Sequence, residues 1–351
     1  MTSIRKPAVV HPSLAKNALG LSIRDYEGSM STLCAGCGHD SVTAAIVRAF
    51  FDLDIAPHQV AKLSGIGCSS KTPTYFVSGA HGFNSAHGRM PAIATGANAA
   101  NRELIYIGVS GDGDSLSIGL GQLCHAIRRN LKMLYVIENN GVYGLTKGQF
   151  SASSDVGSKS KRGEPNAQRP IDAAMLGLTL GATFIARSFS GDKEQLVPIL
   201  KAGLRHRGFA LVDVISPCVT FNDHEGSTKS YSQTRQRNLR VLQADFVPPA
   251  EEISVSYPEG TTLAVALHDG STVRFSKVPS DYDPRDRGAV LRYLYDRQSA
   301  GVVPTGLLFV DENLADMHEM SATVATPLSK LAHQDLCPGA HALDDIMESF
   351  R

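Results

Sequence analysis

Apolar residues recur along the first two thirds of the chain in two alternating patterns. Short runs rich in β-branched and aliphatic residues predict strands at 59–63, 103–109, 131–137, 182–186 and 209–215. Stretches of helical periodicity predict helices from Asp40, with His39 at its start, through 120–127, from Ile171 and over 193–204. Strands that alternate with helices build a parallel sheet covered on both faces. The pattern therefore predicts an α/β fold with a doubly wound, mostly parallel sheet over 40–220.

The segments on either side of this pattern look different. Residues 1–30 are polar, with prolines at 7 and 12, and are expected to form an irregular lead-in segment. After about residue 231 charged segments alternate with turn signals, such as 257–260 and 268–270. We therefore expect an α/β domain over 31–230 and a C-terminal extension over 231–351 that contacts another subunit. Within the domain, 151–170 is rich in Ser, Lys and Gly and is too long for an ordinary connection, which indicates a functional or mobile loop.

Composition narrows the class of protein. With 351 residues, 42% of them apolar and 19% charged, the chain can bury a large core and is not disordered. Its 34 basic residues balance 34 acidic ones, so the net charge is zero. The excess of basic residues that is typical of nucleic-acid-binding proteins is missing. No apolar run reaches the roughly 18 residues of a membrane helix, and the N-terminus lacks the apolar core of a signal peptide. We therefore expect a cytoplasmic protein without a membrane partner.

Two polar motifs follow two of the predicted strands. Gly111-Asp112-Gly113 comes after 103–109, and Asn139-Asn140 comes after 131–137. Because parallel strands end at the same edge of a sheet, both motifs are expected where ligands bind in α/β folds. A carboxylate and an amide oxygen are hard donors that suit Mg²⁺ with phosphate oxygens. The helix beginning near Ser115 would direct its backbone amides at the anion.

Each motif alone is also a common turn sequence. The ligand-site interpretation is favoured over two simple turns only because the two motifs occur together. A dinucleotide fingerprint fits poorly, because the third glycine of Gly-x-Gly-x-x-Gly is missing. The pair resembles instead the diphosphate and metal motif of thiamine diphosphate enzymes. That resemblance implies Mg²⁺ ligation by Asp112, Asn140 and the backbone carbonyl of Val142.

Four of the six cysteines form a second candidate site. Cys34 and Cys37 form a Cys-x-x-Cys pair, while Cys68 and Cys218 each follow a predicted strand. Four thiolates could hold either zinc or an iron–sulfur cluster, and the spacing does not decide between them. A redox dithiol is less consistent with the sequence, because no thioredoxin-like unit follows the pair. Cys124 is expected in the core, and Cys337 has no evident partner.

The two constellations together resemble one family. The segments CAGCGH, SGIGCSS, HGR, ATGAN, GDGDSLSIG, NNGVYGLTKGQ and SPCVTFND occur in the order typical of the β subunit of 2-oxoacid:ferredoxin oxidoreductases, over about 31–224. Ala35 replaces a frequent proline of the family. The resemblance implies the thiamine diphosphate-binding fold and a [4Fe–4S] cluster on Cys34, Cys37, Cys68 and Cys218, in place of zinc. The cofactor-binding residues that it implies are Gly67, Cys68, Ser69, His87, Gly111, Asp112, Gly113, Asp114, Asn140, Val142, Gly144 and Leu145.

The resemblance also implies the reaction and the partners. Thiamine diphosphate would act as the electron sink for loss of CO₂ from a 2-oxoacid, coenzyme A would take the acyl group, and ferredoxin would take the electrons. Activation of the aminopyrimidine needs a glutamate that no motif here provides. An α subunit is therefore expected to supply it, so the chain should be inactive outside a heterodimer or a dimer of heterodimers.

Two further side chains are candidate catalytic residues. His87 could face the diphosphate or the reacting carbonyl, and a structural role in its glycine-rich turn is the alternative. Lys147 follows the metal motif and could pair with a substrate carboxylate or with coenzyme A, unless it is simply solvated. A lysine beside the distal carboxylate favours 2-oxoglutarate, with succinyl-CoA as product, over pyruvate. A non-oxidative thiamine enzyme would not need the four cysteines, and a zinc-stabilised binding module would not need the GDG and NN motifs.

Overall fold

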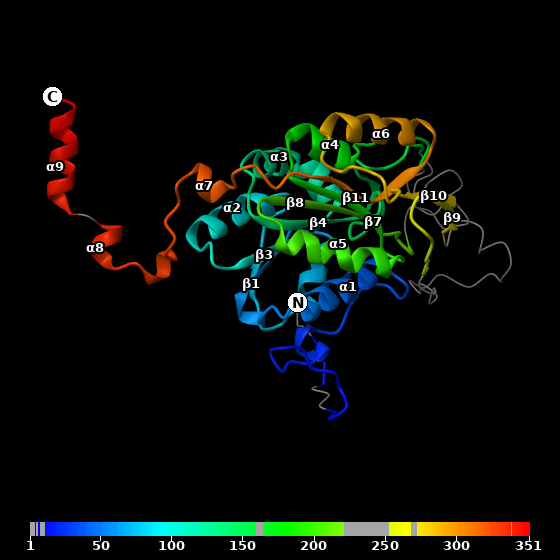
Figure 1. Ribbon diagram of the computed structural model, residues 1–351, viewed down its shortest axis with the longest axis horizontal. Coiled ribbons are helices and arrows are strands. Elements are labelled where there is room, and N and C mark those ends of the chain that lie inside the picture. Colours follow the sequence, from blue (N-terminus) through cyan, green and yellow to red (C-terminus); the bar gives the residue numbers. More distant parts are fainter. Residues whose placement is uncertain are drawn as a thin grey trace.

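A single long sheet organises the chain. The computed structural model describes residues 4, 6–7, 11–158, 164–220, 253–267, 272–337 and 339–351. Within these ranges nine strands form one sheet in the order β2-β1-β3-β4-β8-β7-β11-β10-β9, and helices lie on both of its faces (Figure 1). The predicted doubly wound, mostly parallel α/β fold is confirmed.

The strands of this sheet are β1 (Val60–Ser64), β2 (His81–Asn84), β3 (Ile105–Gly111), β4 (Met133–Asn139), β7 (Phe184–Phe189), β8 (Phe209–Ile215), β9 (Thr262–Ala266), β10 (Thr272–Lys277) and β11 (Val303–Val310). A separate hairpin pairs β5 (Val142–Tyr143) with β6 (Gln149–Phe150). The helices are α1 (Gly38–Asp52), α2 (Met90–Ala100), α3 (Leu120–Arg128), α4 (Ala173–Leu180), α5 (Lys193–Arg205), α6 (Arg287–Ser299), α7 (Met317–Met320), α8 (His333–Leu336) and α9 (Ala340–Ser349). A π-helical segment, η4 (Gly113–Ile118), precedes α3, and short 3₁₀ turns are η1 (Ile23–Tyr26), η2 (Pro57–Gln59), η3 (Ser69–Thr74) and η6 (Leu328–Lys330).

Two apolar cores lie on opposite faces of the sheet. One packs α1 and α5 against the central strands, and the other packs α2, α3, α4 and α6 against the opposite face. Every residue of β4 and β8 is buried, which explains why these strands are nearly continuous apolar runs. Helix α4 begins at Ala173, two residues after the predicted start, because the Asp172 side chain accepts a hydrogen bond from Met175 N–H and caps the first turn.

The connection order creates a ligand-binding edge. Strands β1, β3, β4, β8 and β7 are parallel neighbours, so the loops that follow them meet at one edge. The chain passes from β1 outward to β2 and then returns to β3 on the other side of β1. Such a reversal in strand order opens a crevice outside the carboxyl ends of the strands.

The C-terminal region adds structure that the sequence pattern did not predict. Strand β11 pairs antiparallel with β7, β10 is parallel to β11, and β9 is antiparallel to β10, so residues 262–310 extend the same sheet. The expected boundary at 230/231 lies outside the described residues. Beyond β11, helices α7, α8 and α9 lead away from the sheet (Figure 1), and subunit contact by this segment stays a prediction. Among the helices described, none has the length and apolar character that crossing a membrane requires.

Candidate active site at the carboxyl edge of the sheet

The motifs singled out in the sequence meet at this edge. The loops after β1, β3, β4 and β8 carry Cys68, Asp112, Asn140 and Cys218, and these four strands are consecutive neighbours in the sheet. Helix α1 begins here too, directly after Cys34 and Cys37: a side chain added at Gly38 would lie 2.7 Å from Ser216 Oγ. A parallel sheet thus brings segments more than 180 residues apart to one place.

Asp112 is at the centre of the oxygen-rich part of the site. Its carboxylate is 1% exposed; Oδ1 accepts a hydrogen bond from Asn140 N–H at 3.3 Å, and Oδ2 accepts one from Ser153 Oγ at 2.5 Å and another from Ser151 Oγ. Asn140 Oδ1 in turn accepts the Val142 N–H at 3.0 Å. The three predicted magnesium ligands are therefore linked directly to one another. Carboxylate, amide and carbonyl oxygens are the donor set that Mg²⁺ prefers, so the residues fit this cation.

Glycines leave the backbone of this loop in close contact with its surroundings. A Cβ at Gly111 would lie 2.6 Å from Ser69 Oγ, and one at Gly113 would lie 2.5 Å from the Tyr143 ring. Side chains at these positions would displace Ser69 and the β5 strand. The Gly-Asp-Gly sequence is therefore required by packing as well as suited to a backbone that approaches phosphate.

The four predicted cluster ligands form one group. A side chain at Gly144 would begin 3.4 Å from Cys68 Sγ and 3.9 Å from Cys218 Sγ, and the Thr220 hydroxyl donates to Cys34 Sγ at 3.5 Å. Burial raises the pKa of Cys37 well above its usual range, and the nearby Cys218 and Glu138 raise it further. Burial also raises the pKa of Cys68, with a contribution from Cys34. Gathering four thiolates here is costly unless a cationic group compensates their charge.

The arrangement does not match the site of a single ion. Within the described ranges, no three His, Cys, Asp or Glu side chains stand close enough together to hold one metal ion. Cys34 is exposed, Cys37 is buried, and Cys68 and Cys218 are half-buried. Soft sulfur donors suit both zinc and an iron–sulfur cluster, and the assignment of a [4Fe–4S] cluster to these cysteines stays a prediction. Cys337 is exposed, and Cys124 is half-buried on α3 and outside the apolar core in which we expected it.

A buried polar cluster joins the thiols to the oxygen ligands. His39 Nδ1 lies 2.6 Å from Ser216 Oγ and 3.6 Å from Glu138 Oε2, and His39 Nε2 lies 3.5 Å from Asn140 Nδ2. Complete burial lowers the pKa of His39 to about 4, so its ring is neutral at pH 7. Burial raises the pKa of Glu138 well above its usual range, although the Thr72 hydroxyl donates to its carboxyl group.

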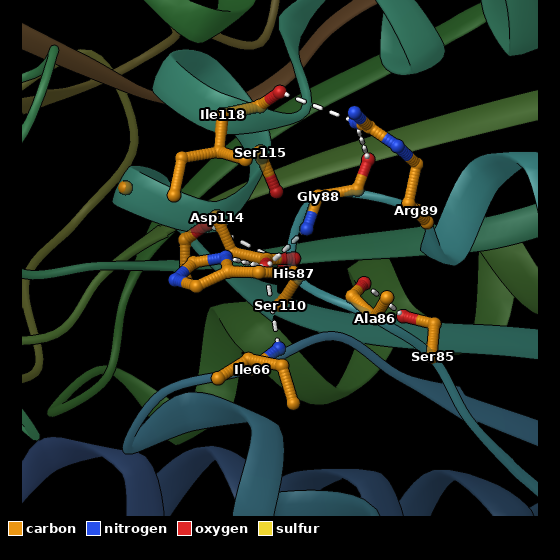
Figure 2. Close-up of polar contacts among 12 residues, drawn as sticks. Ile66, Ser85, Ala86, His87, Gly88, Arg89, Ser110, Asp114, Ser115 and Ile118 are labelled. Atoms are coloured by element: carbon orange, nitrogen blue, oxygen red, sulfur yellow. Dashed lines mark hydrogen bonds and ion pairs between the residues drawn. The ribbon is translucent and has the colours of Figure 1, made fainter.

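His87 and Asp114 form a second polar pair on the rim of the site (Figure 2). His87 Nδ1 lies 2.5 Å from Asp114 Oδ1, and Asp114 also accepts hydrogen bonds from Gly88 N–H, Ile66 N–H and Ser110 Oγ. One buried carboxylate thus ties the HGR turn, the loop after β1 and strand β3 together. The His87 side chain is one third exposed and meets the Tyr143 ring edge-on.

The β5–β6 hairpin carries the remaining candidates. It starts at the predicted metal ligand Val142, passes Cys68 Sγ and Cys218 Sγ at Gly144 and exposes Leu145 and Lys147 at its tip. Lys147 has φ +78°, a left-handed conformation that normally selects glycine. A function for the Lys147 side chain stays a prediction.

Behind the site, Arg187 anchors the loop residues to the sheet. Its Nε lies 2.8 Å from Asp213 Oδ2 and its Nη2 lies 2.7 Å from Asp172 Oδ1. Asp213 Oδ1 accepts a hydrogen bond from Asn139 Nδ2, and Asn139 Oδ1 accepts one from Ser153, whose hydroxyl also donates to Asp112. This chain of contacts runs from the metal ligand into the core.

We expect Arg187→Met to destabilise the protein by about 3–5 kcal/mol, because the buried Asp213 and the half-buried Asp172 lose their counter-charge. Urea unfolding of the purified chain would measure the loss. Arg48→Met is the matched control, because Arg48 pairs with Asp52 at the surface and such pairs contribute about 1 kcal/mol or less. Equal losses in the two variants would show that Arg187 does not anchor the core.

Sequence reasoning assigned no role in the site to several of these residues. Thr72 and Glu138 lay in no quoted motif, Ser216 lay in the SPCVTFND segment without a role of its own, Ser151 and Ser153 lay in the loop expected to be functional or mobile, and His39 was expected only to begin a helix. A signal was present for two of them: Glu138 is an acidic residue at the end of an apolar strand, and Ser151 opens a serine-rich segment directly after the metal motif.

Comparison with known proteins agrees with this geometry. Residues 61–214 match the family model described as thiamine pyrophosphate enzyme, C-terminal TPP binding domain. A 2-oxoacid:ferredoxin oxidoreductase subunit beta of Saccharolobus solfataricus is 40% identical over 207 residues, which are 59% of this chain and 67% of the relative. The 2-oxoglutarate oxidoreductase subunit KorB of Mycobacterium tuberculosis is 41% identical over 244 residues, which are 67% of this chain and 64% of the relative.

A solved structure supports the same assignment. The 2-oxoglutarate:ferredoxin oxidoreductase from Magnetococcus marinus, with 2-oxoglutarate, coenzyme A and succinyl-CoA bound, is 28% identical and has a TM-score of 0.69. The match covers 89% of this chain and 92% of that one, so it includes strands that lie beyond the family model. The motif order, the nine-stranded sheet of the described residues and these similarities agree: the chain belongs to the family of 2-oxoacid:ferredoxin oxidoreductase β subunits.

Proposed function

We propose that this chain is the β subunit of an enzyme that oxidatively decarboxylates 2-oxoglutarate to succinyl-CoA and passes the electrons to ferredoxin, or runs the reverse carboxylation. The observation that carries the proposal is the meeting of Asp112, Asn140 and Val142 with four cysteines at one sheet edge. When bound, thiamine diphosphate supplies the electron sink for loss of CO₂, and a [4Fe–4S] cluster accepts electrons one at a time. All six cysteines are described and are free, so the four thiols of the proposed cluster site are not tied up in disulfides.

The chain's own residues divide the work. Asp112 and Asn140, with the Val142 carbonyl, would hold Mg²⁺, and the backbone of Gly111 and Gly113 would approach the diphosphate. Asp114 orients the His87 ring, so the free ring nitrogen could donate to the diphosphate or to the reacting carbonyl. Cys34, Cys37, Cys68 and Cys218 would bind the cluster a short distance away, which suits stepwise electron transfer.

Two partners complete this proposal. An α subunit would supply the carboxylate that activates the aminopyrimidine, and ferredoxin would take electrons from the cluster near exposed Cys34. The direct test is co-expression with the α subunit, followed by coenzyme A-dependent reduction of viologen with several 2-oxoacids. Activity that required neither coenzyme A nor an electron acceptor would instead support a non-oxidative decarboxylase.

The preference for 2-oxoglutarate depends on Lys147. The M. tuberculosis relative and the M. marinus structure are both named for 2-oxoglutarate, and a distal carboxylate needs a cationic partner in a poorly solvated pocket. Lys147 is exposed at the tip of the hairpin, and its strained backbone is compatible with a side chain kept for binding. Pyruvate, which has no distal carboxylate, is the alternative substrate.

We expect Lys147→Gly to lower kcat/KM for 2-oxoglutarate by about 10- to 100-fold, the value of a hydrogen bond to a charged group. Activity on pyruvate should change little, because glycine also relieves the left-handed backbone. Steady-state kinetics on both acids measures the difference, with Lys330→Gly on the C-terminal segment as the control. Equal losses of kcat/KM on both acids would indicate that Lys147 binds coenzyme A or supports the loop. No loss on either acid would show that Lys147 is a solvated loop residue.

A further inference from the structure

His39 occupies a position between the two cofactor sites. It is 1% exposed, lies two residues after Cys37, and its two ring nitrogens face different segments. Nδ1 is 2.6 Å from the hydroxyl of Ser216, which precedes Cys218 by two residues. Nε2 is 3.5 Å from the side-chain amide of Asn140.

The hydrogen-bond pattern fixes the orientation of the Asn140 amide. Asn140 Oδ1 accepts the Val142 N–H at 3.0 Å, which identifies this atom as the oxygen. The NH₂ group therefore faces His39 Nε2, and a donor there requires Nε2 to be an acceptor. A neutral ring with its proton on Nδ1 satisfies both sides, since that proton can be donated to Ser216 Oγ, with the Glu138 carboxyl group 3.6 Å away.

The partners of His39 Nδ1 are themselves fixed. Ser216 is fully buried and lies against the start of α1, where Gly38 leaves no room for a side chain. Glu138 is fully buried and accepts from the Thr72 hydroxyl. The core thus fixes the imidazole of His39, and the imidazole in turn contacts Asn140, a ligand of the proposed metal site.

We propose that His39 is a positioning residue of the metal site: its Nε2 holds the NH₂ group of Asn140, so that Oδ1 is available to the cation. This inference rests on the proposed function, because it takes Asn140 as a magnesium ligand. When a residue orients a metal ligand by binding the ligand's second polar atom, its substitution typically lowers metal affinity by about 10- to 100-fold.

Two polar substitutions separate the positioning role from simple packing. Glutamine places its amide near the position of Nε2, whereas asparagine reaches only the position of Nδ1. In the complex with the α subunit, we expect His39→Asn to raise the Mg²⁺ concentration that half-saturates thiamine diphosphate binding by about 10- to 100-fold. His39→Gln should stay within a few-fold of the parent, and Ser216→Ala should weaken Mg²⁺ binding by about fivefold through a looser ring. Calorimetric titration with Mg²⁺ and thiamine diphosphate reads this out without substrate.

The controls distinguish the two ways of failing. His318→Asn removes another buried imidazole, whose Nδ1 meets Thr323 Oγ1 at 2.8 Å, and should leave Mg²⁺ affinity unchanged. One outcome would overturn the role of His39 and leave the proposed function intact. In it, His39→Asn and Ser216→Ala keep the Mg²⁺ affinity of the parent, whereas Asp112→Asn loses it. Equal losses in His39→Gln and His39→Asn would also overturn it, because the acceptor would then not matter. Unchanged affinity in Asp112→Asn would overturn the metal site itself, and this inference with it.

Discussion

Asp112→Asn is expected to abolish retention of thiamine diphosphate at Mg²⁺ concentrations that saturate the parent protein. The substitution keeps the shape of the side chain, and an asparagine can still accept the Asn140 N–H while its NH₂ group donates to Ser151 and Ser153. Only the negative charge is lost. A hard divalent cation depends on that charge, so Mg²⁺ affinity should fall by about 100-fold or more, beyond the effect of residues that merely orient a ligand.

The experiment uses the complex with the α subunit and measures Mg²⁺-dependent thiamine diphosphate binding by calorimetry. Iron content should match the parent, because the cysteines are not altered. Asp52→Asn is the matched control, since it removes a carboxylate at the opposite end of α1, where Asp52 pairs with Arg48 and Lys201. Parental thiamine diphosphate affinity in Asp112→Asn would show that Asp112 does not hold the metal.

The sheet and the meeting of the motifs could be predicted because parallel strands impose strong rules. Strands buried on both faces are apolar runs, and each must end at the same edge as its parallel neighbours. Once 103–109 and 131–137 were identified as such strands, Asp112 and Asn140 had to lie together, and the structure places them in direct contact. The same rule applied to Cys68 and Cys218, whose strands β1 and β8 flank that pair.

The rest of the sheet could not be predicted in this way. Strand β9 alternates between exposed positions and positions that are partly buried or, at Val265, buried, and β10 has charged and hydroxyl residues along it. The apolar run of β9, 263–267, is only five residues long and lies between turn signals, and β10 has no such run, so the local pattern alone did not identify either strand. Their place is set by pairing with β11, which itself runs antiparallel to β7, and pairing between distant segments leaves no local signal.

The supporting residues of the site were hidden for a related reason. Motifs mark residues that touch a ligand, whereas Ser153 and His39 act through Asp112 and Asn140, and their partners are 14 to 177 residues away in sequence. A buried histidine also has the same local sequence whether it supports a ligand or only packs. Only coordinates show that its two nitrogens face two different parts of the site.

The cysteines present a problem of charge that a cluster would solve. Burial raises the pKa of Cys37 and Cys68, and the neighbouring thiols and Glu138 raise it further, so without a metal these sulfurs stay protonated. Ligation requires thiolates, and the positive charge of iron is what makes four of them stable together. Removing one ligand therefore leaves one iron of the cluster without a protein thiolate, and such a cluster is held less firmly.

Cys68→Ala is accordingly expected to lose the cluster and, with it, electron transfer to ferredoxin. Anaerobically purified parent complex should be brown, with absorbance near 400 nm that dithionite bleaches, while the variant should be colourless, with little iron and no coenzyme A-dependent viologen reduction. Thiamine diphosphate should still bind, because Asp112, Asn140 and Val142 do not depend on this thiol for their contacts. Cys124→Ala makes the same substitution on half-buried Cys124 of α3 and should keep both colour and activity. Stoichiometric zinc in a colourless parent, or full iron in Cys68→Ala, would rule out the assigned cluster, since a [4Fe–4S] centre held by four thiolates cannot survive unchanged when one of its ligands becomes a methyl group.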